Sequence, residues 1–238
     1  MKKAIVIGAS SGIGKELARV LSQNGYAVGL TGRRVELLTA LQNELSTESF
    51  VKPMDISQTD KAIRQLTELI DEMNSVELIV ISAGVGFINS EFEWEKEKST
   101  IETNVFGFAA MANVAVKHFL EQRAGHLVGI SSIAALRGTG GAPAYNASKA
   151  FVSNYLEGLQ QKCVKLKLPI VVTDVKPGFV DTAMAQGEGL FWVAPPEKAA
   201  RQIYKAIKAR KTHVYVTKRW RSIGVLLKLM PSSIYNKM

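Results

Sequence analysis

Tyr145 and Lys149 are the residues of this chain whose types and spacing best suit proton chemistry. A tyrosine with the ordinary pKa of about 10 is a poor proton shuttle at neutral pH. On a helix, a lysine four residues later lies on the same face, and its positive charge favours the phenolate and brings the pKa toward the working range. Because such pairs are also common on helix surfaces, this one indicates a reaction only if a site surrounds it.

A glycine-rich turn near the start of the chain predicts such a site. It follows the apolar run Ala4–Ile7, which is typical of a buried strand, and precedes a pattern with helical spacing. Glycines there permit a tight turn, a close approach to a pyrophosphate and tight packing of the helix, whose N-terminus attracts phosphates. The context favours a dinucleotide site over a purely structural turn. The expected contacts are Gly8, Ser10, Ser11, Gly12, Ile13 and Gly14.

The end of the second expected strand favours NADP over NAD. An NAD site has an acidic residue there for the ribose 2′-hydroxyl. This chain instead has Gly32 followed by Arg33 and Arg34, whose planar guanidinium groups suit a 2′-phosphate. The alternative is that both arginines are solvated residues at the start of the next helix.

The elements that must position these residues alternate between strand and helix patterns. Such alternation predicts an α/β fold, a single doubly wound Rossmann-type parallel sheet with helices on both faces. Pro53 in the third strand favours an edge position, which the order 3-2-1-4-5-6 provides. Two long helices are expected, at about 97–121 and 144–165. The expected strands are Ala4–Ile7, Ala27–Thr31, Phe50–Met54, Val76–Ser82, His126–Ile130, Ile170–Val175 and His213–Val216.

Taken together, the glycine spacing, Ser132 and Tyr145-xxx-Lys149 resemble the short-chain dehydrogenase/reductase family from about Lys3 to Thr217. The resemblance implies that Ser132, thirteen residues before Tyr145, holds the substrate oxygen, with Ser131 as the alternative. It also implies that Lys149 binds the nicotinamide ribose and that Asn104 positions a water leading to solvent. The predicted catalytic residues are therefore Asn104, Ser132, Tyr145 and Lys149.

Further landmarks of the family extend the predicted cofactor site. Asp55 and Ile56 match the pair beside the adenine, and Ala83-Gly84 matches the core of Asn-Ala-Gly. The segment from Pro177 and Gly178 to Val180 and Thr182 matches the one that meets the nicotinamide carboxamide. Two positions depart from the pattern, Ile7 in place of Thr and Ser82 in place of Asn. We expect these to change local hydrogen bonding without removing activity.

The substrate lid of such proteins corresponds here to residues 183–193. It contains Met184, Leu190, Phe191 and Trp192, with Gly187 and Gly189 as candidate hinges. These apolar residues indicate an apolar carbonyl substrate, unless Phe191 and Trp192 only pack the lid down.

Residues 218–238 form a basic amphipathic tail after the expected domain, 1–217. One helical side carries Trp220, Ile223, Leu226, Leu227 and Met230. Such a segment can rest on an anionic membrane through 218–230, cover the substrate pocket or form a subunit interface.

Charge is concentrated toward the end of the chain. Residues 197–238 hold eleven Lys or Arg residues and one acid, whereas the first 196 residues carry a net charge of −1. This asymmetry indicates either an anionic partner surface or a solvated basic face. We expect no nucleic-acid binding, because no recognised motif accompanies the charge.

The remaining composition favours a cytoplasmic protein without a metal site, and peripheral contact with a membrane stays open as an alternative. Cys163 is the only cysteine, and the three histidines show no metal-ligand spacing. By analogy with the family, the two long helices predict a homodimer or homotetramer.

These features predict an NADP-dependent oxidoreductase that interconverts a ketone or aldehyde and an alcohol. One alternative is a 3-oxoacyl-thioester reductase, although the chain continues past Val216 into the basic tail instead of paired glycines. The other is a non-catalytic dinucleotide sensor, which the presence of both Tyr145 and Lys149 disfavours.

Overall fold

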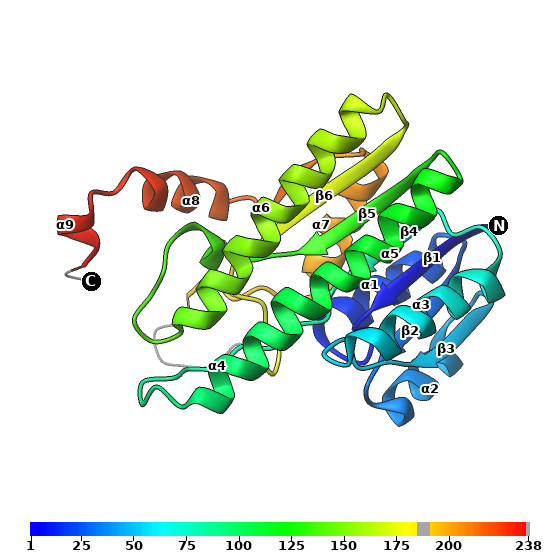
Figure 1. Cartoon of the computed structure of the whole chain (residues 1–238), viewed down its shortest axis with the longest axis horizontal. Coiled ribbons are helices and arrows are strands. Elements are labelled where there is room, and N and C mark those ends of the chain that lie inside the picture. The colour runs from blue at the N-terminus through cyan, green and yellow to red at the C-terminus, as the bar shows by residue number, and fades with distance from the viewer. Residues whose placement is uncertain (185–190, 237–238) are drawn as a thin grey trace.

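A parallel sheet forms the centre of the computed structural model, which describes residues 1–184 and 191–236 (Figure 1). Its order is β3-β2-β1-β4-β5-β6-β7, so the predicted doubly wound order is confirmed, with a seventh strand beside the sixth. Pro53 ends β3 at the sheet edge, where its missing N–H breaks no ladder. The strands are β1 (Lys2–Ile7), β2 (Tyr26–Gly32), β3 (Ser49–Pro53), β4 (Leu78–Ile81), β5 (Gly125–Ile130), β6 (Ile170–Pro177) and β7 (His213–Val216).

Helices cover both faces of the sheet because side chains alternate along each buried strand. Ala4 and Val6 of β1 pack in the core beneath α1, α2 and α7. Ile5 and Ile7 face the opposite core, beneath α3, α5 and α6. The helices are α1 (Gly12–Gln23), α2 (Val35–Glu44), α3 (Thr59–Met73), α4 (Trp94–Ile101), α5 (Phe108–Glu121), α6 (Pro143–Lys165), α7 (Pro196–Lys208), α8 (Trp220–Leu229) and α9 (Ser232–Tyr235).

The first predicted long helix is not one regular helix. It begins at Trp94, and a π-helical turn, η1 (Glu102–Gly107), separates α4 from α5. Gly107 packs against the loop that follows β3, and an added Cβ would lie 2.6 Å from the Ile56 carbonyl oxygen. The wider turn carries Asn104 and matches the tendency of π-turns to occur at functional sites.

The end of β6 differs from prediction for a reason that lies in the tertiary structure. β6 extends to Pro177 because β7 pairs with Asp174–Pro177. In α2, Leu38 and Leu41 are buried, whereas Leu37 is 41% exposed. Neighbouring leucines of α2 thus differ in burial.

The sheet changes its winding direction between β1 and β4, and this creates a crevice at their carboxyl ends. The backbone N–H groups of Ser82 and Ala83 both donate to the Ile7 carbonyl oxygen, at 2.8 Å. These bonds hold the two strand ends together without the Thr and Asn side chains that the family usually places there.

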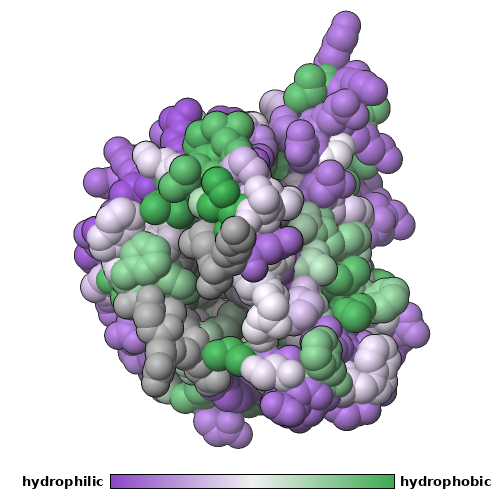
Figure 2. Space-filling view, turned by 90° about the vertical axis from the view of Figure 1, so that its left-hand side faces the viewer, coloured by the Kyte–Doolittle hydropathy of each residue, from purple (hydrophilic) through white to green (hydrophobic). Residues whose placement is uncertain are grey.

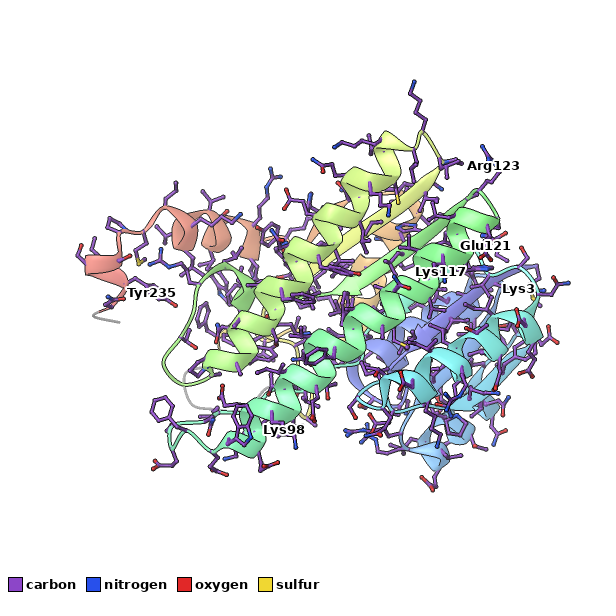
Figure 3. All side chains as sticks on the ribbon, in the orientation of Figure 1. Lys3, Lys98, Lys117, Glu121, Arg123 and Tyr235 are labelled. Atoms are coloured by element: carbon purple, nitrogen blue, oxygen red, sulfur yellow. The ribbon has the colours of Figure 1, made fainter. Side chains whose placement is uncertain are left out.

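The chain after β7 forms α8 and α9, which extend from one end of the sheet (Figure 1). Tyr235 of α9 lies at the opposite end of the molecule from Lys3 (Figure 3). Among the helices of the described residues, none is both long and apolar enough to cross a membrane.

Candidate active site

The carboxyl ends of the strands open into a cavity of about 1300 Å³. Most of the predicted site residues line it, although they come from segments far apart in the sequence. The exceptions are Gly14 and Asn104, which lie behind its wall. The predicted residues along the wall are Gly8, Ser10, Ser11, Gly12, Ile13, Arg33, Arg34, Asp55, Ile56, Ala83, Gly84, Ser132, Tyr145, Lys149, Pro177, Gly178, Val180 and Thr182.

The glycine turn has the geometry that a pyrophosphate requires. Gly8 has a φ of 92° and Gly12 one of 56°, which side chains rarely adopt. An added Cβ on Gly14 would lie 2.2 Å from the Gly8 carbonyl oxygen, so Gly14 serves the packing of α1 against the strand. α1 begins at Gly12, and the Ser11 side chain makes no capping bond, which leaves N–H groups free for phosphate oxygens.

Arg34 reaches over this turn. Its Nη2 donates to the hydroxyls of Ser10 and Ser11, at 3.0 and 2.7 Å, and Arg33 is exposed beside it. Two guanidinium groups and two hydroxyls therefore lie at the end of β2. This donor set is chemically suited to a phosphate group.

The next wall segment follows β3. Asp55 accepts hydrogen bonds from the backbone N–H and the hydroxyl of Ser57, at 3.1 and 2.8 Å. Its carboxylate is thereby held in a short turn, and the neighbouring Ile56 is buried beside η1. Both positions suit a planar base at the cavity edge.

Tyr145 and Ser132 both line the cavity, and a hydrogen bond joins their side chains. α6 begins at Pro143, which suits a first helical position, and Tyr145 therefore lies in the first turn. Burial raises the pKa of the Tyr145 phenol, and a hydrogen bond with Ser132 opposes that effect. The Ser132 hydroxyl also accepts from the Ala134 N–H, at 3.1 Å.

Lys149 follows Tyr145 by one turn and is buried. Its Nζ donates to the Ile130 carbonyl oxygen, at 3.0 Å, and lies 5.8 Å from the centre of the Tyr145 ring. Burial lowers its pKa to about 8, and the charge of Asp174 opposes this. Burial raises the pKa of the Tyr145 phenol and so acts against the lowering that we expect from Lys149.

Asn104 lies behind Gly84, and its side-chain amide is fully engaged. Its Oδ1 accepts from the Val85 N–H at 2.9 Å, and its Nδ2 donates to the Val85 carbonyl at 2.7 Å and the Ser148 hydroxyl at 3.0 Å. A Cβ added to Gly84 would lie 3.1 Å from that Oδ1 and 3.3 Å from Lys149 Nζ. Asn104 is thus near Lys149 without a direct bond.

Between the two candidate serines, the geometry favours Ser132. Ser131 is buried, and its hydroxyl is within hydrogen-bond reach of Asp174 and the Val175 carbonyl. It is therefore directed into the protein beneath the site, whereas Ser132 contacts Tyr145.

Gly86 is a site residue that the sequence reasoning missed. An added Cβ there would lie 2.8 Å from a ring carbon of Tyr145. The signal was present as a second glycine two positions after Gly84, but its purpose depends on a contact with α6 that spacing does not reveal.

The other end of the cavity is apolar, and the tail forms part of its wall. Three positions are expected for the tail, and in the structure the tail lies against the pocket. The five apolar residues of its predicted side all line the cavity: Trp220, Ile223, Leu226, Leu227 and Met230.

An aromatic cluster joins the tail to the segments beneath it. The Trp220 ring centre lies 5.3 Å from that of Phe179 and 5.2 Å from that of Phe191. Gly178 permits this contact, since an added Cβ would lie 2.0 Å from Trp220. Met184 and Phe191 of the predicted lid line the cavity, whereas Leu190, Gly187 and Gly189 lie outside the described residues.

Arg137 attaches the far part of the tail to the loop before α6. Its guanidinium donates to the Met230 carbonyl at 3.0 Å and lies 4.4 Å from the centre of the Tyr235 ring. Tyr235 in turn donates to the Gly138 carbonyl at 2.7 Å. No sequence pattern indicated these contacts, because they join residues almost a hundred positions apart.

Hydrophobic surface gathers around a hollow on the face that carries α8, α9 and α4 (Figure 2). Leu226 is 58% exposed and Leu229 76% exposed on α8, and Phe92 and Trp94 are also exposed. This face carries both the cavity wall and apolar side chains directed to solvent.

The histidines and the cysteine lie away from this chemistry. Burial lowers the pKa of His126 to about 4, and its ring contacts the Thr173 hydroxyl at 2.7 Å. Cys163 is packed in the core. The described part of the chain holds no cluster of three or more potential metal ligands.

The sequence model of the short chain dehydrogenases matches residues 2–190, and this chain belongs to that family. A protein of Myxococcus xanthus named as an uncharacterized oxidoreductase is 38% identical over 189 residues, which are 77% of this chain and 74% of the relative. The chain is thus an oxidoreductase of the short-chain dehydrogenase/reductase type with a dinucleotide-binding fold.

Solved structures agree on the fold. A short-chain dehydrogenase from Sphingobium yanoikuyae in complex with NADPH has a TM-score of 0.83 at 20% identity, covering 98% of this chain and 97% of that one. A family member from Burkholderia phymatum in complex with NAD has a TM-score of 0.85 at 20% identity, with 94% and 92% covered. The likeness does not distinguish between the two cofactors.

Proposed function

We propose that this protein is an NADP(H)-dependent oxidoreductase that interconverts an apolar ketone or aldehyde and the corresponding alcohol. The observation that carries the proposal is a single cavity that joins a phosphate-binding turn, the Ser132–Tyr145 pair and an apolar wall. A bound nicotinamide would supply or accept the hydride. All other steps fall to residues of this chain.

Tyr145 is the proton donor in the reducing direction. Its phenol lies beside the Ser132 hydroxyl, so a carbonyl oxygen held by Ser132 is within reach of the proton. In the oxidising direction the same phenol accepts the proton of the alcohol.

Lys149 supplies the positive charge that this transfer needs. With a pKa of about 8, it retains its proton at neutral pH despite its burial. A substrate oxygen that gains negative charge is therefore formed near a buried cation, which stabilises it. Asn104 supports this arrangement by holding the Val85 backbone and Ser148.

Preference for NADP is supported by the donors at the end of β2. Arg34 and the hydroxyls of Ser10 and Ser11 already form one group, and none of these residues is acidic. A carboxylate that would select a free ribose 2′-hydroxyl is missing from Gly32, Arg33 and Arg34.

An apolar substrate is supported by the tail. α8 contributes aliphatic side chains to the cavity wall, which Ile133 and Phe179 also line. A 3-oxoacyl thioester is the second candidate, because an acyl chain suits the same wall and the basic tail suits an acidic carrier.

Two further expectations belong to this proposal. Peripheral contact with an anionic membrane through residues 218–230 is supported by the exposed Leu226 and Leu229 beside Arg221 and Lys228. Assembly as a homodimer or homotetramer is supported by Phe106, an exposed aromatic on the long-helix surface. Both suit a cytoplasmic protein.

NADPH consumption across ketones, aldehydes and acyl thioesters of increasing chain length tests the proposal. We expect turnover with apolar carbonyl compounds and a preference for NADPH over NADH. Absence of turnover across the panel with intact NADPH binding would favour a dinucleotide sensor.

A further inference from the structure

A buried ion pair lies directly behind the catalytic residues. Asp174 and Lys176 are two positions apart on β6, so their side chains leave the same face of the sheet. They are 1% and 7% exposed, and Lys176 donates to the Asp174 carboxylate. Burial of two charges carries a desolvation cost that their attraction offsets only in part, so the pair is a poor device for stability alone.

The Asp174 carboxylate joins the two elements that carry the catalytic groups. It accepts from the hydroxyl of Ser131, which precedes Ser132 at the end of β5. It also accepts from the hydroxyl of Ser153 at 2.7 Å, and Ser153 lies one turn after Lys149 on α6. One carboxylate therefore holds the Ser132 strand end and the Lys149 helix in register.

The pair also sets the charge around Lys149. Asp174 faces Lys149 from β6 and raises its pKa, against the larger opposite effect of burial. Lys176 lies on the same strand, Tyr145 faces Lys149 from its own helix, and Tyr215 of β7 lies beside Lys176 in register. His213 of β7 pairs with Asp174 in register, and the charge of Arg221 on α8 acts on Tyr215.

We propose that Asp174 and Lys176 are positioning residues that set the charge state of Lys149 in opposite directions. Asp174 favours the ammonium form of Lys149 and orients the strand end and the helix. The positive charge of Lys176 offsets part of the negative charge of Asp174. The inference rests on the proposed function, because it assigns the pair a role in the proton chemistry of Tyr145 and Lys149.

Charge removal on either side tests this inference. In carbonyl reduction, the basic limb of the pH profile of kcat/KM should fall where Lys149 loses its proton. Lys176→Met should move that limb to higher pH and Asp174→Asn to lower pH, each by about one pH unit. The double variant removes both charges and should restore the limb to near its original position. Lys162→Met, an exposed site on α6, is the matched control and should cause no shift.

A second readout does not depend on turnover. Protein without cofactor, labelled with ¹³C at lysine Cε, is titrated by NMR, and the Lys149 signal is assigned from its loss in Lys149→Met. The midpoint should move in the same opposite directions. This measurement tests the pair even if no carbonyl substrate responds, so failure of the inference and failure of the proposed function are distinguishable.

Shifts of opposite sign that cancel in the double variant support the inference, since loss of packing alone predicts no such pattern. Folded single variants with an unchanged limb, or with shifts in the same direction, would overturn it. If Asp174→Asn does not fold, Lys176→Met and the double variant decide, because the first must move the limb and the second must not.

Discussion

The two ends of the cavity are formed by different kinds of chemical groups. At the cofactor end, backbone groups and small residues such as Gly8 and Gly12 form a turn whose shape follows from local chain geometry. At the substrate end, large side chains from the loop before α6, the segment after β6 and the tail meet only in the folded protein. The side chains of the apolar wall can therefore be substituted without disturbing the groups that carry out the reaction.

The boundary between the two ends is the Ser132–Tyr145 pair, and its loss should have the largest effect. Tyr145→Phe removes the proton donor and should reduce kcat by about 10²- to 10⁴-fold while NADPH binding persists. Tyr155→Phe on the same helix is the control, because Tyr155 stacks on Phe151 away from the cavity wall. Initial-rate assays measure turnover, and NADPH fluorescence measures cofactor binding. Substantial residual turnover would refute the proton-donor role.

Cofactor binding should depend on the charge of the residues after β2 and not on their size. In Arg33→Ala/Arg34→Ala, loss of charged hydrogen bonds worth about 1.5–3 kcal/mol should weaken NADPH binding about 10- to 100-fold. NADH affinity should stay near its starting value, because NADH has no 2′-phosphate. Arg64→Ala, exposed on α3, is the control for net charge. Equal losses for NADPH and NADH would remove the NADP assignment.

Turnover of long substrates should depend on the size of the apolar side chains of α8 and not on charge. Leu227→Ala removes about three buried carbon groups worth roughly 0.8 kcal/mol each, so kcat/KM for long-chain carbonyl substrates should fall about 10-fold or more. Short substrates should be little affected. Val225→Ala is the matched control, because Val225 lies on the same helix but is exposed and does not line the cavity. A similar fall for all chain lengths would mean that α8 acts through folding.

The smallest expected effect concerns the outer side of the tail. Arg221→Glu/Lys228→Glu reverses two exposed charges and should reduce co-sedimentation with anionic vesicles severalfold, because basic residues near an anionic surface are attracted to it. Lys205→Glu/Lys208→Glu on α7 carries the same change of charge elsewhere and serves as the control. Equal partitioning of all three proteins would exclude membrane contact through the tail.

Much of the cofactor end could be predicted because local rules decide it. The glycine spacing, the run of arginines after β2 and the Tyr145–Lys149 interval each depend on the geometry of one strand, turn or helix. The alternation of strand and helix patterns then placed these segments at one edge of a parallel sheet. Even the edge position of Pro53 follows from its missing N–H.

Predictions were incomplete where a residue's environment depends on distant segments. Spacing predicted that Lys149 lowers the Tyr145 pKa, but burial of the phenol acts in the opposite direction, and burial is a property of the whole fold. The role of Gly86 beside Tyr145 was not visible in the sequence at all.

By itself, therefore, the sequence determined the fold, the family and the residues available for reaction, because periodicity and short motifs encode them directly. Only the tertiary structure decided that the tail lines the pocket, that Ser132 and not Ser131 meets Tyr145, and that Asp174 joins both sides of the site. These outcomes depend on desolvation and on contacts between residues far apart in the chain. Such effects arise only after the elements pack together.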